Sequence, residues 1–385
     1  MSGNRFLRFI ITWRAPAAAA AFFALFSAVS LNMYEVNPEE VALLEGTLVK
    51  RNTHINGSPM RNDVYPQPEE WDYWRELLPR GTDGLIVWMG NSHLHAVNGM
   101  KEGDEVSSYY LHELLNGGKW PGRAPCFGLS YPNLTFAEQF LLTLLLTLDQ
   151  SLPRPLIFVH GFRYHETRFA GVRSGLKPVL EDPSVKKWIE SNGELAGKFP
   201  EAFKSLDSEY RAIKELEKER NFEGFLRKRA GGAIPVFKDR KTISAHLALM
   251  MRNLRDFAFG IRTSDKRKAL SSRYGVSMEF MELTAYVCER YGAKMLMYNV
   301  PLRPGKESPY PEADYDRYME EMESIARKYP RGIVYADYED AIPEPAWGVF
   351  YSTGMKDFSH FKAEGHRILA EKATGDLRKA GFLEF

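Results

Sequence analysis

The stretch that decides the fold is Gly84-Leu85-Ile86-Val87-Trp88-Met89-Gly90-Asn91-Ser92, in which five apolar residues run into a turn. A short, continuous apolar run bounded by turn residues is typical of a strand buried on both faces of a parallel sheet. Ligands of open parallel sheets bind beyond the carboxyl ends of the strands, so Ser92 stands where chemistry is expected. A glycine-x-serine turn alone says little, because serine commonly caps the helix that follows.

Four further apolar runs are punctuated in the same way, at residues 125–129, 156–159, 294–298 and 332–336. Between the runs lie stretches with helical patterning, at residues 136–150, 277–291 and 312–328. Strands that alternate with helices predict a parallel sheet covered by helices on both faces, which is a three-layer α/β/α fold. Residues 140–148 are almost wholly apolar, and we expect a helix buried against the sheet, with a re-entrant membrane segment as the alternative.

The composition is that of a folded globular protein. Of the 385 residues, 44% are hydrophobic and 26% are charged, which excludes a wholly disordered, collagenous or multi-span membrane protein. Lys and Arg number 51 against 50 Asp and Glu, so the chain lacks the basic excess of nucleic-acid-binding proteins, and we expect no nucleic acid as a partner. The two cysteines, Cys126 and Cys288, exclude a disulfide framework or a zinc knuckle and leave one disulfide open.

The N-terminus predicts export. Three arginines within the first 14 residues precede an apolar run over residues 15–31, and three glutamates follow between residues 35 and 40. Basic residues before such a run place the N-terminus in the cytoplasm and the rest of the chain outside, in the periplasm or at the cell surface. We expect a single-pass membrane anchor over residues 1–34. A cleaved signal peptide is the alternative, because Ala28-Val29-Ser30 resembles a cleavage site.

After the anchor, residues 35–80 are polar and turn-rich and are expected to form a linker. Residues 81–385 are expected to form one α/β domain with a mostly helical insertion at about 166–272. Between residues 201 and 230, 15 of 30 residues are charged, as in a solvated helix. Apolar residues then recur at helical spacing over 243–258, and this helix is expected to pack on the sheet, with a partner or membrane surface as the alternative.

A second motif, Asp357-Phe358-Ser359-His360, lies near the C-terminus before a helical stretch at residues 363–374. An acid three residues before a histidine can accept one imidazole N–H and leave the other nitrogen free to take a proton from a serine. Neither motif is specific alone, but the chain holds an ordered set: a serine after the first strand, glycines after the second and third, and the acid and histidine before the last helix. These residues are Ser92, Gly128, Gly161, Asp357 and His360.

This ordered set resembles the SGNH hydrolase family, also called GDSL-type esterases, over about residues 84–375 apart from the insertion. The resemblance implies that Ser92 is the nucleophile, His360 the base and Asp357 the group that orients it. It also implies an oxyanion hole made by the backbone N–H groups of Ser92 and Gly128 and by an asparagine side chain of the third block.

The chain departs from the family pattern in two places. Asn91 stands where the first block commonly has an aspartate before the serine, and the resemblance places it with Gly128, Gly161 and Arg163 among the expected oxyanion or substrate-binding residues. The third block, commonly Gly-x-Asn-Asp, reads Gly161-Phe162-Arg163-Tyr164. Arg163 would then occupy the position of the oxyanion donor, where a guanidinium can stabilise developing charge or bind a substrate carboxylate or phosphate.

The resemblance implies acyl transfer through a seryl acyl-enzyme, with no cofactor. An anchored SGNH-like domain is similar in architecture to exported proteins of D-alanyl transfer to teichoic acid and of alginate acetylation, which work beside a membrane-bound O-acyltransferase. We therefore expect an esterase or O-acyltransferase that uses an acyl donor and a glycan or polyol acceptor of the cell envelope, with a membrane-bound O-acyltransferase as a further partner. The alternatives are a secreted carboxylester hydrolase without partner and a non-catalytic scaffold of such an acyltransferase.

Four histidines lie near the predicted strand ends, at positions 93, 95, 160 and 165. Their spacing matches no metal-ligand motif, so no metal is expected. We expect His93 and His95 to contact substrate or to lie on a helix surface.

Overall fold

The computed structural model describes residues 80–211 and 271–384, apart from residues 120, 170, 306–307, 309 and 350–355, together with residue 78 and three short strands between residues 47 and 61. The predicted anchor over 1–34 and the part of the predicted insertion from residue 212 to 270 lie outside the described residues. Within the described part of the chain, no helix is both long and apolar enough to cross a membrane.

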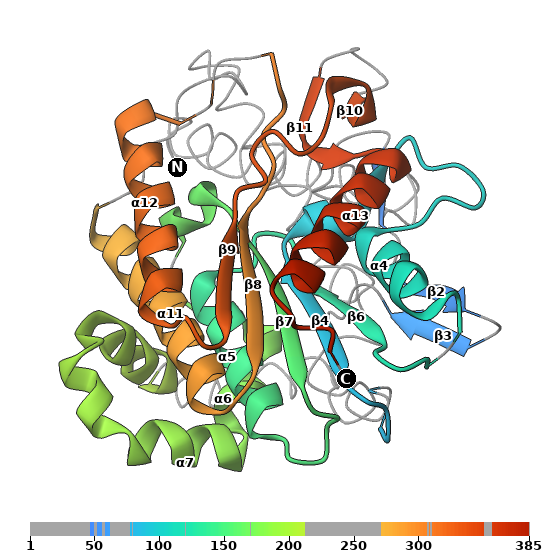
Figure 1. Cartoon of the computed structure of the whole chain (residues 1–385). Helices are drawn as coiled ribbons and strands as arrows, with labels where there is room; N and C mark the ends of the chain where they lie inside the picture. The colour runs from blue at the N-terminus through green and yellow to red at the C-terminus, as the bar shows by residue number, and fades with distance from the viewer. Residues whose placement is uncertain are drawn as a thin grey trace, which may run out of the picture. The chain divides into compact units, whose positions relative to one another are not determined.

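A five-stranded parallel sheet forms the centre of the described region (Figure 1). Its strand order is β6-β4-β7-β8-β9, and all neighbouring strands run parallel. The strands are β4 (Leu85–Gly90), β6 (Cys126–Ser130), β7 (Leu156–Phe162), β8 (Lys294–Asn299) and β9 (Ile333–Ala336). Each coincides with one of the five apolar runs, so the predicted parallel sheet is confirmed.

Helices cover both faces of this sheet, which gives the three layers expected. On one face, α5 (Phe136–Leu148), α11 (Ser271–Arg290) and α12 (Glu312–Lys328) share an apolar core with the odd-numbered residues of β4. On the other face, α4 (Ser107–Asn116) and α13 (Ala363–Lys379) pack against the even-numbered ones (Figure 1). Successive strand residues point to opposite faces, and every residue of β4 and β7 is buried, which explains their unbroken apolar sequence.

Helix α5 is the apolar stretch predicted to be buried, and its side chains from Phe136 to Thr147 are buried. Its start is fixed by a capping box, in which the Thr135 hydroxyl accepts the N–H of Glu138 and the Glu138 carboxylate accepts the N–H of Thr135. Between β7 and residue 211, the described chain is helical, with η3 (Tyr164–Arg168), η4 (Ser174–Leu176), α6 (Lys177–Glu181), α7 (Pro183–Ser191), η5 (Gly193–Gly197) and a helix over 200–211.

A second sheet carries the C-terminal motif. Its order is β1-β5-β11-β10, and β5 runs parallel to β11, with Phe361 opposite Val97. These strands are β1 (Thr47–Val49), β5 (Ala96–Asn98), β10 (Trp347–Val349) and β11 (Lys356–Phe361). Since β5 follows β4 closely in the chain, this pairing brings the end of β4 next to β11. Strand β1 and the hairpin of β2 (Asn52–Ile55) and β3 (Ser58–Arg61) lie within the segment predicted as a linker.

Candidate active site

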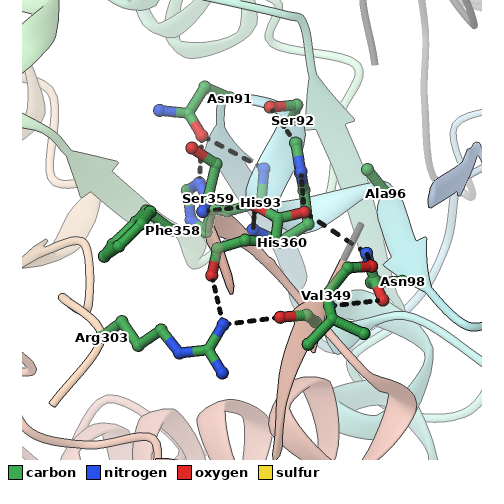
Figure 2. A network of polar contacts seen from close by, with 12 residues as sticks. Asn91, Ser92, His93, Ala96, Asn98, Arg303, Val349, Phe358, Ser359 and His360 are labelled. Carbon is green, nitrogen blue, oxygen red and sulfur yellow. Dashed lines mark hydrogen bonds and ion pairs between the residues drawn. The ribbon is translucent and has the colours of Figure 1, made fainter. Parts of the chain in front are cut away.

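Ser92, His360 and Asp357 form a hydrogen-bonded chain beyond the carboxyl end of β4. Figure 2 shows the contact between Ser92 and His360. Ser92 is the first residue of η2 (Ser92–Leu94), and its Oγ lies 3.0 Å from His360 Nε2. His360 Nδ1 lies 2.9 Å from Asp357 Oδ2. Asp357 is fully buried and His360 is buried, whereas Ser92 is partly exposed. The structure thus brings together three predicted site residues from opposite ends of the described chain, with the serine accessible to a substrate.

The Asp357 carboxylate is held by its own turn. Its Oδ1 accepts the backbone N–H groups of Ser359 (2.8 Å) and His360 (3.2 Å), and Asn98 Nδ2 donates to Oδ2 at 3.4 Å. Burial alone raises the pKa of Asp357, but the hydrogen bond and charge of His360, with these N–H groups, bring the pKa below its ordinary value. An ionised Asp357 accepts the Nδ1–H of His360, so Nε2 is the nitrogen that accepts the hydrogen bond from the Ser92 hydroxyl.

Arg303 binds the backbone of the motif through its guanidinium (Figure 2). Its Nη1 donates to the carbonyl oxygens of Gly348 (2.6 Å) and Asp357 (2.8 Å). Its Nε and Nη2 donate to the two oxygens of Glu344 at 2.8 and 3.0 Å. Hydrogen bonds from Arg303 and Lys356 lower the pKa of Glu344 to about 2. The buried Arg303 therefore joins η6 (Glu344–Ala346), β10 and β11. It lies in the loop after β8, outside any recognisable sequence motif, so the sequence did not predict its role.

Asn91 fixes the turn that presents Ser92. Its Oδ1 accepts the N–H of His93 at 3.2 Å and contacts His93 Nδ1, and its Nδ2 donates to Glu166 Oε1. Glu166 is buried in η3, and its other oxygen accepts the N–H of Arg163 at 3.4 Å. Burial raises the pKa of Glu166 to about 8, against the opposing effects of the Asn91 hydrogen bond and the Arg163 charge. Asn91 was expected among the substrate-binding residues, but both polar atoms of its side chain bind other residues of the protein.

His93 is fully buried against Gly90 of β4 and Gly161 of β7, so the expectation that it contacts substrate or lies on a helix surface is wrong. Its Nε2 lies 3.0 Å from the Tyr298 hydroxyl, which also accepts the Trp88 Nε1–H at 2.9 Å. Burial, and then the charge of Arg163 and three other histidines, lower the pKa of His93 far below its ordinary value. The neutral ring therefore donates from Nδ1 to Asn91 and accepts at Nε2 from Tyr298. His95 is buried too, with Nδ1 2.8 Å from Ser130 Oγ.

Gly128 was expected in a turn after the second strand, but it lies within β6, opposite Trp88. The N–H of Tyr131 bonds to Gly90 on β4 at 3.1 Å, whereas the N–H of Cys126 bonds to His112 at the opposite edge. Because N–H directions alternate along a strand, the N–H of Gly128 points to the same edge as that of Cys126, away from β4 and Ser92. Gly128 is therefore not positioned as an oxyanion donor.

Gly161 also lies within a strand, β7, and its role is to leave space. A Cβ atom on Gly161 would lie 2.5 Å from the Tyr298 hydroxyl oxygen and 3.1 Å from His93 Cε1. A Cβ atom on Gly90 would lie 2.9 Å from the same His93 atom. Two glycines on neighbouring strands thus make the slot that His93 fills, which corrects the expectation of a glycine in the substrate-binding turn.

Arg163 follows β7 directly and is half-buried. Both of its Nη atoms lie 3.3 Å from the hydroxyl oxygen of Ser359, the residue before His360, and its Nε lies 3.3 Å from that of Tyr310. The guanidinium is therefore beside the Asp357–His360 motif of β11.

No protein-family model matches the sequence, and no curated protein is detectably similar to it. Within the described residues, no group of three or more histidine, cysteine or acidic side chains is arranged to hold a metal ion. Cys126 and Cys288 are both free and buried, so the disulfide left open by the sequence does not form.

Proposed function

We propose that this protein is a serine acyl hydrolase or O-acyltransferase of the SGNH type, with Ser92 as the nucleophile. The observation that carries the proposal is the chain from the partly exposed Ser92 hydroxyl through His360 to the buried Asp357 carboxylate. Its place supports the same conclusion. From β4 the chain passes first to β6 on one side of the sheet and then to β7 on the other, so the strand order changes direction beside β4. In open α/β sheets, ligands bind beyond the carboxyl ends of the strands at such a switch point.

In the proposed reaction, His360 Nε2 takes the Ser92 proton while Oγ attacks the carbonyl carbon of an ester. The tetrahedral intermediate collapses, the alcohol leaves with the proton from His360, and the acyl group stays on Ser92. Water or an acceptor hydroxyl then gives its proton to His360 and attacks the acyl-enzyme, which releases the acid or the new ester and restores Ser92. Asp357 stabilises the imidazolium, and the backbone N–H of Ser92 is a candidate oxyanion donor.

We further propose that the acceptor is a carbohydrate or polyol hydroxyl outside the cytoplasm and that a membrane-bound O-acyltransferase supplies the acyl group. The support for this location is the arginine-flanked apolar run within residues 1–34. The acceptor can be tested by incubating the full-length protein and a soluble acyl donor with and without glycan. Transfer to glycan at the expense of free acid supports the acyltransferase. Hydrolysis that glycan never diverts indicates a hydrolase without partner.

Labelling by a fluorophosphonate tests the nucleophile. We expect the folded full-length protein to be modified at Ser92, as mapped by peptide mass spectrometry, and Ser92→Ala to lose the label and at least about a thousandfold in esterase kcat. Ser191→Ala, which changes an exposed serine at the end of α7, is the matched control and should be labelled like the wild type. A folded wild-type protein that stays unlabelled would sink the proposal.

A further inference from the structure

The Arg163 guanidinium has more donors than the described partners satisfy. Its Nε faces the Tyr310 hydroxyl at 3.3 Å, while Nη1 and Nη2 converge on the single hydroxyl oxygen of Ser359, both at 3.3 Å. Nη2 also faces the carbonyl oxygen of Phe358 at 3.5 Å. All these acceptors are neutral, and the distances are at the long end for hydrogen bonds. A planar fork of two N–H groups instead matches the two oxygens of a carboxylate or phosphate.

Two other arginines whose side chains are mostly buried have such a partner. Arg303 holds both oxygens of Glu344, and Arg173 holds both oxygens of Glu138 at 2.7 and 2.8 Å. For Arg163, no carboxylate lies within ion-pair distance among the residues that the structure describes. Of these three arginines, Arg303 and Arg173 each bind a carboxylate, whereas the two Nη atoms of Arg163 contact only neutral oxygen atoms of the described residues.

The two acids that interact electrostatically with Arg163 are both committed elsewhere. Asp357 bonds to His360, and Glu166 accepts from Asn91 and from the Arg163 backbone. Burial raises the pKa of Glu166 to about 8, so at neutral pH the uncharged form of Glu166 predominates and does not neutralise Arg163.

The position of Arg163 relates this charge to the reaction. Ser359, which the fork contacts, precedes His360 in the chain. Glu166, which accepts the Arg163 N–H, holds Asn91, the residue before Ser92. The Arg163 guanidinium thus lies among the residues that flank both the nucleophile and its base, and Arg163 as a residue is partly exposed.

We propose that Arg163 binds an anionic group of the substrate, a carboxylate or a phosphate, carried within a few atoms of the scissile ester. The inference rests on the proposed function and narrows its substrates to acidic esters or acidic acceptors. The anion would take the place of the Ser359 hydroxyl on the two Nη atoms, and no covalent step involves Arg163.

Matched esters test this selectivity in the full-length protein. One pair places the charge on the acyl side (4-nitrophenyl hydrogen succinate against 4-nitrophenyl butyrate), and the other on the alcohol side (4-acetoxybenzoate against phenyl acetate). For at least one pair, we expect Arg163→Gln to lower the anionic-to-neutral ratio of kcat/KM at least about tenfold, and Arg163→Lys to lower it less. Arg123→Gln, at an exposed ion pair with Asp83, is the control and should keep the wild-type ratio. An equal loss on both members of both pairs would assign Arg163 to the oxyanion and overturn the proposal.

Binding gives a readout that does not need turnover. Full-length Ser92→Ala is titrated by calorimetry with succinate and with inorganic phosphate, and the ion that binds more tightly identifies the kind of anion. We expect the added Arg163→Gln change to raise the Kd of that ion at least about tenfold, with an unchanged circular dichroism spectrum as the check on folding. Should neither ion bind Ser92→Ala, or should both bind the double variant equally well, the anion site does not exist, whether or not Ser92 proves to be a nucleophile.

Discussion

The space beside Ser92 is determined by single residues, and glycines decide how closely β4, β7 and His93 approach one another. Adding a methyl group at Gly161 puts Cβ 2.5 Å from the Tyr298 hydroxyl oxygen and 3.1 Å from His93 Cε1, so both buried rings must shift. We expect Gly161→Ala to lower the free energy of unfolding by about 1–3 kcal/mol, measured by urea denaturation. In Gly193→Ala, where the new Cβ meets nothing within 4 Å, the free energy of unfolding should fall by less than about 0.5 kcal/mol. Equal effects at the two glycines would contradict the tight slot around His93.

Glu166 makes stability depend on pH in a definite direction. Burial raises its pKa from 4.5 to about 8. A carboxyl group whose pKa is higher in the folded protein stabilises the fold at low pH, and this contribution is lost as the pH rises from about 4.5 to about 8. Glu166→Gln has no proton to lose, so its Tm should fall less than that of the wild type over this window. Exposed Glu194→Gln should keep the wild-type slope, and a slope unchanged in Glu166→Gln would refute the assignment.

At the scale of elements, Arg303 sets the position of the β11 turn through three separate segments. Replacing it by Gln leaves the Glu344 carboxylate and the carbonyl oxygens of Gly348 and Asp357 without their charged donor. We expect a loss of about 1–3 kcal/mol in stability and a fall in kcat of at least about tenfold, with a smaller change in KM, because Asp357 and His360 shift relative to Ser92. Arg367→Gln, on the exposed face of α13, is the matched control. If Arg303→Gln changes stability but not kcat, the residue has only a structural role.

Elements with a strong apolar signal were predictable from the sequence, and short polar ones were not. The runs that form β4, β6, β7 and β8 are buried on both faces, and this burial explains why their sequences are continuously apolar. Strand β11 reads Lys-Asp-Phe-Ser-His-Phe, and β5 and β10 have three residues each. Such strands exist because of their neighbours in the second sheet, which no local pattern records.

The same distinction applies to the candidate site. Ser92 and the Asp357–His360 pair were predictable because the chemistry requires particular residue types at particular spacings. Gly128 was misplaced because a glycine inside a strand and one in a turn look alike without the strand register. Glu166 and Arg303 were missed because their roles come from long-range burial and from contacts with segments far away in the chain.

At the scale of the whole molecule, one sheet separates two apolar cores, and both should melt together with the site. Leu144 on α5 and Leu369 on α13 are fully buried on opposite faces. We expect Leu144→Ala and Leu369→Ala each to lower the free energy of unfolding by about 2–5 kcal/mol, and Leu114→Ala, at a residue that is 42% exposed, by less than about 1 kcal/mol. In urea, tryptophan fluorescence and fluorophosphonate labelling of Ser92 should change at the same midpoint. Labelling lost well before fluorescence would show instead that the site opens locally.

The contact between Ser92 and His360 joins residues 268 positions apart, and this separation has a consequence for biosynthesis. A ribosome makes the serine 268 residues before it makes the base, so the growing chain carries Ser92 without His360 during that interval. On the growing chain the hydroxyl is an ordinary serine, because neither the imidazole nor the carboxylate that would activate it exists yet. Under the proposed mechanism, a chain that stops before residue 357 contains the serine but lacks the base and the acid that activate it. Such a truncated chain would therefore not form the acyl-enzyme.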